Sequence, residues 1–196
     1  MTRVEAERLT PDQSRLLNAL GLIALNTILV LAFIDQIWFR DLPCPLCILQ
    51  RAGFIAAGFG LALNLLFGAR PGHYGVTILG AIAGAVIAGR QVLLHIVPGT
   101  GSYGNPIFGL HLYTWALIAF GVMVIGTAIM LLFDRQFQGE LLRPRMDIWA
   151  LMSLTIFAAV IVANIVSTLL LCGVGFCPDN PAGYLIFRDN LSVTSG

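Results

Sequence analysis

The sequence contains no lysine, so all eleven of its cations are arginine. Charged residues of either sign make up only 11% of the chain, and the net charge at pH 7 is +1. A protein that binds nucleic acid carries a cluster of excess cations, and this balance therefore excludes that class of partner. Hydrophobic residues make up 58% of the chain, a value typical of an integral membrane protein. We expect the lipid bilayer to surround this chain.

The N-terminal region lacks a signal-peptide cleavage pattern. Residues 1–15 are polar and mixed in charge, and the uncharged run 16–34 that follows is longer than the apolar core of a signal peptide. We therefore expect a retained membrane helix here, since about 20 apolar residues span a bilayer. The expected fold is an all-α integral membrane protein with five spanning helices. Four more apolar runs predict the other helices, at 45–67, 74–97, 112–133 and 148–171.

The arginines predict how these helices are oriented. Loops rich in arginine stay in the cytoplasm, so the N-terminal segment 1–15 and the loop 134–147 are expected there. The tail 172–196 and all four cysteines then lie on the outer side of the membrane, where an oxidising compartment preserves disulfides. The arginines that give this orientation are Arg3, Arg8, Arg15, Arg70, Arg135, Arg143 and Arg145.

Two cysteines stand at the predicted start of the second helix. Cys44 and Cys47 are three residues apart and so share one helical face, and the positive end of a helix favours a thiolate. Pro45 is compatible with a first helical turn, because no backbone donor is needed there. Arg51 lies one turn beyond Cys47, where its charge can stabilise a thiolate or an anion beside it. This pattern predicts a redox centre at the end of a membrane helix.

Other kinds of site also use a Cys-x-x-Cys pair. Covalent haem attachment requires a histidine directly after the second cysteine, and Ile48 excludes it. A zinc site built from Cys44, Cys47, Cys172 and Cys177 stays open, as does a pair of structural disulfides. A non-catalytic membrane protein with such cysteines is therefore the alternative to a redox enzyme, although neither arrangement requires a cation beside the first pair.

Arg51 and Arg90 are both expected about 9 to 11 Å below the outer surface of the membrane. A charge at mid-membrane costs about 2.5 to 3.5 kcal/mol, unless the side chain reaches the interface by snorkelling. Snorkelling is the ordinary explanation for either residue alone. Two arginines at one depth, one of them below a cysteine pair, instead predict a shared polar pocket for a ligand with oxygen acceptors, such as a quinone.

Three stretches of the chain resemble the DsbB family of inner-membrane proteins that generate disulfides. Residues 44–51, CPLCILQR, match the family's Cys-x-x-Cys-x-x-x-Arg at the start of its second helix. Residues 89–98, GRQVLLHIVP, resemble the end of its third helix, and residues 109–117, GLHLYTWAL, the entry to its fourth. The resemblance covers the four-helix bundle, about residues 16–133. It implies a four-helix DsbB-like bundle with one additional C-terminal helix.

The resemblance also implies a function and its residues. The family oxidises a periplasmic, thioredoxin-fold partner of the DsbA type and passes the electrons to a quinone, either ubiquinone or menaquinone. Cys44 and Cys47 would form the pair beside the quinone, with Cys47 facing it and Arg51 as its electrostatic partner. Arg90 and His95 are further candidates for the quinone pocket, although His95 can equally be an interfacial side chain. Bundles similar to vitamin K epoxide reductase use the same motif, but the GLxLYxW stretch favours the DsbB-like assignment.

The chain departs from the family in its outer cysteines. The family carries a second cysteine pair in the loop between its third and fourth helices, whereas the loop 98–109 here is short and has no cysteine. The fifth predicted helix instead delivers Cys172 and Cys177 to the periplasmic side. Two glycines between them allow a short, easily closed loop, so we expect a disulfide there. This disulfide either replaces the missing relay pair or is a structural clip for the tail.

Overall fold

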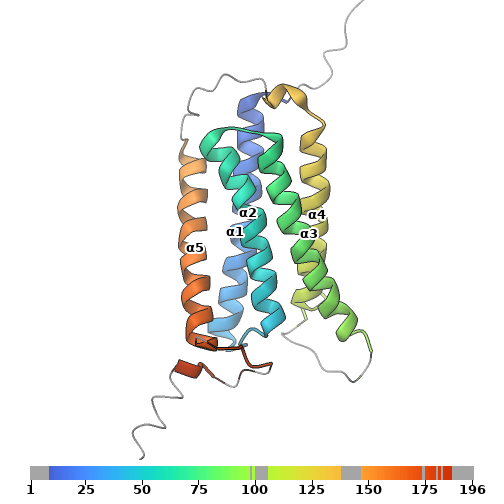
Figure 1. Ribbon diagram of the computed structural model, residues 1–196, viewed down its shortest axis with the longest axis vertical. Helices are drawn as coiled ribbons and strands as arrows, with labels where there is room; N and C mark the ends of the chain where they lie inside the picture. The colour runs from blue at the N-terminus through green and yellow to red at the C-terminus, as the bar shows by residue number, and fades with distance from the viewer. Residues whose placement is uncertain are drawn as a thin grey trace, which may run out of the picture.

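The computed structural model describes residues 9–97, 99, 106–137, 147–173, 175–179, 181 and 183–186. It has the α-helices α1 (Pro11–Trp38), α2 (Pro45–Phe67), α3 (Pro71–Leu94), α4 (Leu112–Leu131) and α5 (Ile148–Cys172), with the short 3-10 helix η1 (Asp134–Phe137) after α4. All five α-helices are long and apolar enough to cross a membrane. They run side by side along the long axis of the molecule (Figure 1). The predicted all-α membrane fold is confirmed.

The helix ends depend on capping residues that a hydropathy pattern does not detect. Thr10 forms a capping box with Gln13, in which its backbone N–H donates to Gln13 Oε1 at 2.9 Å and its hydroxyl accepts from the Gln13 backbone at 3.3 Å. Pro11 occupies the first helical position, so α1 begins inside the segment 1–15 that was predicted to precede it. Pro71 likewise begins α3 three residues before the predicted start.

The helices pack in a defined order. The second helix lies between α1 and α3, while α4 packs on α3 and α5 packs on α1. The contact between α2 and α3 is close because glycines face the other helix: a Cβ atom added at Gly53 would lie 2.7 Å from the Cα atom of Gly84. Small residues allow membrane helices to approach in this way. A ring pair between Phe54 of α2 and Phe120 of α4, with centroids 4.0 Å apart, fills the space beside it.

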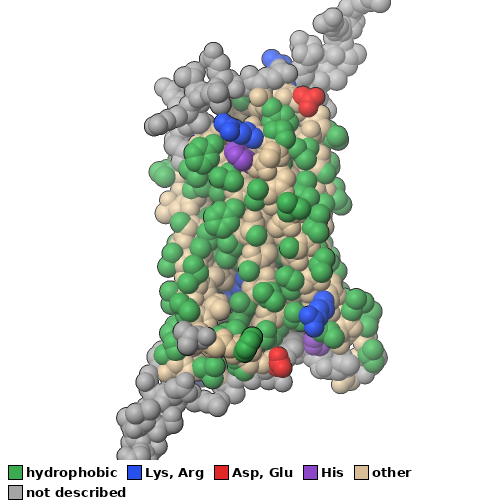
Figure 2. All heavy atoms as spheres, in the orientation of Figure 1, with side chains coloured by type: hydrophobic (Ala, Val, Ile, Leu, Met, Phe, Trp, Pro, Cys, Tyr) green, Lys and Arg blue, Asp and Glu red, His purple; other side chains and the backbone are tan. Residues whose placement is uncertain are grey.

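The outer surface of the bundle is apolar along its sides. Figure 2 shows hydrophobic side chains over the whole visible side of the bundle, whereas most charged side chains in view lie toward its two ends. Leu79, Val86, Val122 and Ile125 are examples of exposed apolar residues of the helices. Such a distribution suits a lipid environment, because exposure of apolar side chains to lipid carries no hydrophobic cost, whereas exposure to water does.

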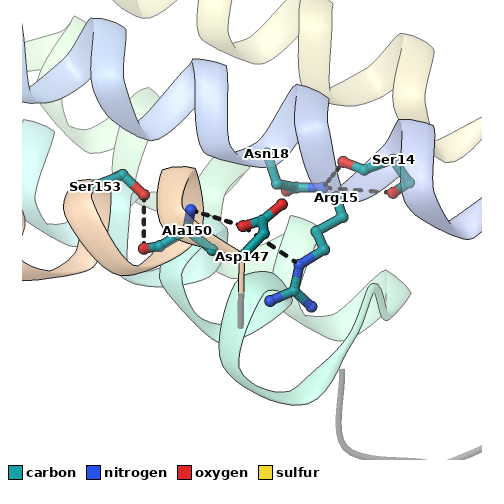
Figure 3. Close-up of polar contacts among 6 residues, drawn as sticks. All are labelled: Ser14, Arg15, Asn18, Asp147, Ala150 and Ser153. Atoms are coloured by element: carbon teal, nitrogen blue, oxygen red, sulfur yellow. Dashed lines mark hydrogen bonds and ion pairs between the residues drawn. The ribbon is translucent and has the colours of Figure 1, made fainter. Parts of the chain in front are cut away.

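Polar contacts join the helices at the end where α1 begins. The Tyr74 hydroxyl of α3 accepts from Asn18 Nδ2 at 2.8 Å and donates to Gln136 Oε1 of η1 at 2.9 Å. Figure 3 shows Arg15 of α1 directed at Asp147, with 4.0 Å between Nε and Oδ1, and Asp147 also caps α5 by accepting from the Ala150 backbone at 2.9 Å. These contacts connect α1 to α3, η1 and the start of α5.

Candidate functional site

All four cysteines lie at one end of the bundle. Cys44 directly precedes α2 and Cys172 is the last residue of α5, and both of these helix ends are at the bottom of Figure 1. Arg15, Arg70 and Arg135 belong to the opposite end, as their places at the start of α1, before α3 and in η1 require. The arrangement agrees with the predicted separation of cysteines from arginines. The remaining arginines of that prediction, Arg3, Arg8, Arg143 and Arg145, lie outside the described residues.

Cys44 caps the N-terminus of α2. Its backbone is extended, and its Sγ atom accepts a hydrogen bond from the backbone N–H of Cys47 at 3.2 Å. This satisfies one of the donors that a helix start leaves unpaired, a role usually filled by a side-chain oxygen. The hydrogen bond between the two cysteine side chains, and burial of the group, raise the pKa of the Cys44 thiol. Cys44 therefore keeps its proton in the dithiol form, and it is only 3% exposed.

A buried amide faces both sulfur atoms. Gln91 of α3 directs its Nε2 group at Cys44 Sγ and at Cys47 Sγ, each at 3.5 Å. Its Oε1 atom accepts from Gln50 Nε2 at 2.6 Å, and Gln91 itself is fully buried. The carboxamide is therefore oriented by Gln50 so that its donor end points toward the sulfurs. Sequence analysis did not single out either glutamine, although Gln50 lies within CPLCILQR and Gln91 within GRQVLLHIVP. A glutamine in a helix is too common to indicate a site by itself.

Arg51 is bound to α1. Its Nη1 atom donates to Gln36 Oε1 at 2.7 Å and its Nη2 atom donates to the Ala32 carbonyl at 2.8 Å. The guanidinium carbon also lies 5.1 Å from the centre of the Phe33 ring, within range of a cation–π contact. These bonds use two of the five N–H groups of the guanidinium, so donors are left for a ligand. Within the described chain, no direct hydrogen bond joins this cation to either sulfur of the pair.

A cavity of about 550 Å³ opens beside Cys47 and Arg51. It lies among α1, α2 and α4, where α1 and α4 are not in close contact, and its walls are mostly apolar. Cys47 lines it, whereas the capping cysteine Cys44 does not. Side chains from the facing helices complete the walls, among them Leu31 and Ile34 of α1, Phe54 of α2, and Tyr113 and Trp115 of α4. Asp35 and Asp41 are further wall residues that sequence analysis did not single out.

Arg90 and His95 do not line this cavity. Arg90 is exposed on α3, so the structure does not form the pocket that equal depth predicted for Arg51 and Arg90. The physical reason is rotation about the helix axis: neighbouring residues differ by about 100°, so a buried Gln91 turns Arg90 outward. His95 lies behind the cavity wall, where its ring is 5.4 Å from that of Tyr113 and its Nδ1 atom is 2.8 Å from the Gln91 carbonyl oxygen.

Cys172 and Cys177 form the expected disulfide. Their Cα atoms are 4.5 Å apart, and the bond closes a short loop after α5. Cys172 is buried at 4% exposure, whereas Cys177 is partly exposed. Because these cysteines are bonded to each other, the four-cysteine zinc site is not formed. The loop 98–109, in which the expected relay pair is missing, lies largely outside the described residues.

Comparison with known proteins finds one family that is similar to this chain. A family model described as Disulfide bond formation protein DsbB matches residues 14–104, which include Cys44, Cys47 and Arg51. A protein named Disulfide bond formation protein B from Burkholderia thailandensis is 27% identical over 165 residues, covering 63% of this chain and 92% of that protein. These matches support the DsbB family for this chain.

Two further DsbB relatives match shorter stretches. Proteins with the same name from Marinobacter nauticus and Nitrosomonas eutropha are 48% identical over 60 residues and 44% identical over 57 residues. These matches cover 29% and 27% of this chain, and 36% and 35% of the relatives. No solved structure matches the chain. Its similarity to DsbB proteins, together with five helices long and apolar enough to cross a membrane, supports a multi-pass bacterial inner-membrane protein of disulfide bond formation.

Proposed function

We propose that this chain oxidises the dithiol of a periplasmic, thioredoxin-fold partner of the DsbA type and passes the electrons to a membrane quinone. The observation that carries the proposal is the order of groups along the start of α2. Cys47 and Arg51 line one apolar cavity, and Cys44 lies directly behind Cys47. A structural cysteine pair needs neither a cavity nor a cation beside it. The N-terminus is then cytoplasmic and the C-terminal tail periplasmic.

The cavity suits a quinone in size, polarity and donors. About 550 Å³ is within the range of small-molecule sites, and apolar walls match a quinone ring and the start of its isoprenoid tail. The free N–H groups of Arg51 are suitable donors for a ring oxygen. Ubiquinone and menaquinone both present such oxygens. When bound, the quinone supplies the two-electron chemistry, and the protein supplies orientation and charge.

The electron balance follows from thiol–disulfide exchange. A dithiol becomes a disulfide by losing two electrons and two protons, and these convert the quinone to a quinol. The structure has Cys44 and Cys47 as thiols, which is the reduced state of this pair. Cys47 faces the cavity and so is the cysteine that would pass electrons to the quinone, while Cys44 would close the new disulfide with it.

Cys172 and Cys177 are the proposed relay to the partner. A partner thiolate would attack Cys177, the more exposed sulfur, to form a mixed disulfide and release Cys172 as a thiolate. The second partner thiol would then release Cys177, which leaves the partner oxidised and this pair reduced. Exchange with the Cys44–Cys47 disulfide would restore the outer disulfide. The competing role is a structural clip that positions the tail.

Replacement of Cys44 or Cys47 by serine tests the central reaction. Quinone reduction by a small dithiol should fall to background in either variant, because a hydroxyl cannot take part in disulfide exchange. The assay follows the loss of quinone absorbance in detergent-solubilised protein. A variant that keeps more than a few per cent of the parent rate contradicts the assignment. Absence of quinone reduction in the parent would favour a non-catalytic role.

The double variant Cys172→Ala with Cys177→Ala separates the relay from the clip. Under the relay, the variant no longer oxidises the protein partner but still reduces quinone with a small dithiol, which can reach Cys44 and Cys47 directly. A mixed disulfide trapped between the partner and one outer cysteine, with the other replaced, is the positive signature. If the double variant oxidises the partner at the parent rate, the relay is wrong and the partner reacts with Cys44 directly.

A further inference from the structure

Gln36 connects the cavity to the C-terminal part of the chain. It lies near the end of α1 and is 3% exposed. Its Oε1 atom accepts from Arg51 Nη1 at 2.7 Å, and its Nε2 atom donates to Ser167 Oγ of α5 at 2.8 Å and to the Tyr184 hydroxyl at 3.1 Å. One buried amide therefore links Arg51 at the cavity to α5 and to the segment after the Cys172–Cys177 disulfide.

The chemistry of these groups determines which way the amide faces. A guanidinium can only donate, so the oxygen of the Gln36 amide must point at Arg51. The nitrogen end then points away from the cavity and needs acceptors, because an unpaired buried N–H is costly. Ser167 and Tyr184 supply those acceptors through hydroxyl oxygens. Without the two hydroxyls, the Gln36 nitrogen would have no acceptor on α5 or on the segment after it. The orientation with the amide oxygen toward Arg51 would then be less stable.

The segment that carries Tyr184 is joined to α5 by the disulfide that precedes it. The Cys172–Cys177 disulfide closes the chain directly after α5, and Tyr184 follows seven residues after Cys177. Ser167 is fixed because it belongs to α5 itself, which packs on α1. Asn26 adds a second tie between these helices, since its Nδ2 atom donates to the Ser153 carbonyl at 2.9 Å. The amide of Gln36 therefore bonds to one hydroxyl on α5 and to one on the segment that the disulfide joins to α5.

We propose that α5 and the segment after its disulfide form a positioning element for the quinone site. Ser167 and Tyr184 orient the Gln36 amide, and the Gln36 amide orients the Arg51 guanidinium toward the cavity. This inference rests on the proposed function, because it assigns the oriented cation to quinone binding. It gives the fifth helix a role in the DsbB-type site that does not depend on whether the outer disulfide is a relay.

Removal of the two hydroxyls tests this positioning with little change in volume. Binding of a short-chain ubiquinone analogue to the purified full chain would be followed by quenching of tryptophan fluorescence, since Trp115 lines the cavity. Ser167→Ala and Tyr184→Phe should each raise the dissociation constant about two- to tenfold, the value of one neutral hydrogen bond. Ser167→Thr keeps a hydroxyl and should bind like the parent. Thr155→Ala removes a hydroxyl of α5 that bonds only within its own helix, and it is the matched control.

A double-mutant cycle shows whether the effect passes through Arg51. In an Arg51→Met background, Ser167→Ala with Tyr184→Phe should weaken binding no further, because the group that they position is gone. Parent-like binding by the Ser167 and Tyr184 variants would overturn the inference. An equal loss of quinone affinity in the parent and in the Arg51→Met background would also overturn the inference. The hydroxyls would then affect binding through the stability of the protein and not through Arg51.

A measurement without quinone distinguishes failure of the inference from failure of the proposed function. Phenylglyoxal modifies arginine, and the rate at Arg51 can be followed by peptide mass spectrometry against the exposed Arg90 as an internal reference. The pair of hydroxyl variants should raise the Arg51 rate several-fold relative to Arg90. An unchanged ratio overturns the positioning role. A raised ratio in a protein that binds no quinone supports the positioning and rejects the proposed quinone site.

Discussion

The charge of Arg51 reaches the cysteine pair from a distance. Its hydrogen bonds go to Gln36 and to the backbone of Ala32, both on α1, while the groups that touch the sulfurs are the neutral amide of Gln91 and a backbone N–H. A direct ion pair with Cys47 would use donors that a ligand needs. Because Arg51 is not bonded to the sulfurs, its remaining N–H groups are available to the cavity. The sulfurs instead face the Gln91 amide, a donor that stays neutral.

Replacement of Arg51 by methionine should weaken the interaction with quinone selectively. A charge-assisted hydrogen bond contributes about 1.5 to 3 kcal/mol, so the quinone concentration for half-maximal rate should rise about ten- to a hundredfold. The dithiol concentration for half-maximal rate should change little. Steady-state rates at varied quinone and varied dithiol measure both values. Arg90→Met is the matched control, and its smaller expected effect follows from its exposed position on α3. An unchanged quinone dependence would reduce Arg51 to a snorkelling side chain.

Gln91 and Gln50 should behave as a coupled pair in stability. Gln91→Leu removes the acceptor of Gln50 Nε2 and leaves a buried donor unpaired, at a cost of about 1 to 3 kcal/mol. Adding Gln50→Leu should recover part of this loss, because replacing both partners by apolar groups is less costly than removing one. Reversible unfolding in detergent, measured for both single variants and the double variant, gives the coupling. Strictly additive losses would show that the two amides do not depend on each other.

The residue pattern predicted part of this site and could not predict the rest. Cys47 and Arg51 belong to one helix and Cys44 caps it, so their spacing alone brought the three residues close together. Gln91 and Gln36 come from other helices, and their contacts depend on how those helices are rotated and how far they are shifted. The sequence predicted that Arg90 lies at the same membrane depth as Arg51. It did not predict the direction in which the Arg90 side chain points around the α3 axis.

At the scale of the helices, hydropathy located all five spans and the caps corrected their ends. α1 is longer than its uncharged run because Thr10, Pro11 and Gln13 begin a helix whatever the hydropathy of the residues after them. The packing order of the helices was not predictable, since each is apolar on most of its surface. Glycine positions decide the closest approach, and the sequence alone does not say which helix each glycine faces.

Gly80 should tolerate substitution much less well than Gly121. A Cβ atom at Gly80 of α3 would collide with the backbone of Ala57 in α2, whereas nothing lies within 4 Å of one at Gly121 of α4. Gly80→Ala forces the two helices apart, and overpacking of this kind costs about 1 to 3 kcal/mol. Thermal unfolding of both variants in the same detergent measures the difference. A Gly80→Ala protein as stable as Gly121→Ala would mean that α2 and α3 are not in the close contact described.

At the scale of the whole molecule, the two ends differ in what joins the helices. The end with Arg15 is connected by side-chain hydrogen bonds among α1, α3 and η1, and it contains no cysteine in the described chain. The other end carries both cysteine pairs, and there Gln36 is the group shared by α1, α2 and α5. The cysteines and the hydrogen bonds around Tyr74 therefore lie at opposite ends of the bundle.

The cavity between α1 and α4 is bordered by side chains that face outward from the bundle. Leu31, Ile34 and Phe108 are 57%, 48% and 92% exposed, and each also lines the cavity. In a bilayer these side chains contact acyl chains, so a hydrophobic ligand arrives by lateral diffusion within the lipid. The concentration that matters is then its mole fraction in the membrane, and the kinetics should show surface dilution.

Proteoliposomes give a direct measure of that behaviour. At a fixed amount of quinone per volume of buffer, added phospholipid should lower the rate under subsaturating conditions, because the same quinone is spread over more membrane. At a fixed ratio of quinone to lipid, the rate per protein should stay constant as total lipid rises. The dependence of the rate on the concentration of the water-soluble dithiol serves as the control and should not change with the amount of lipid. A rate that depends on quinone per volume of buffer would instead mean that quinone enters from water. That outcome would contradict entry from the lipid past the exposed apolar side chains.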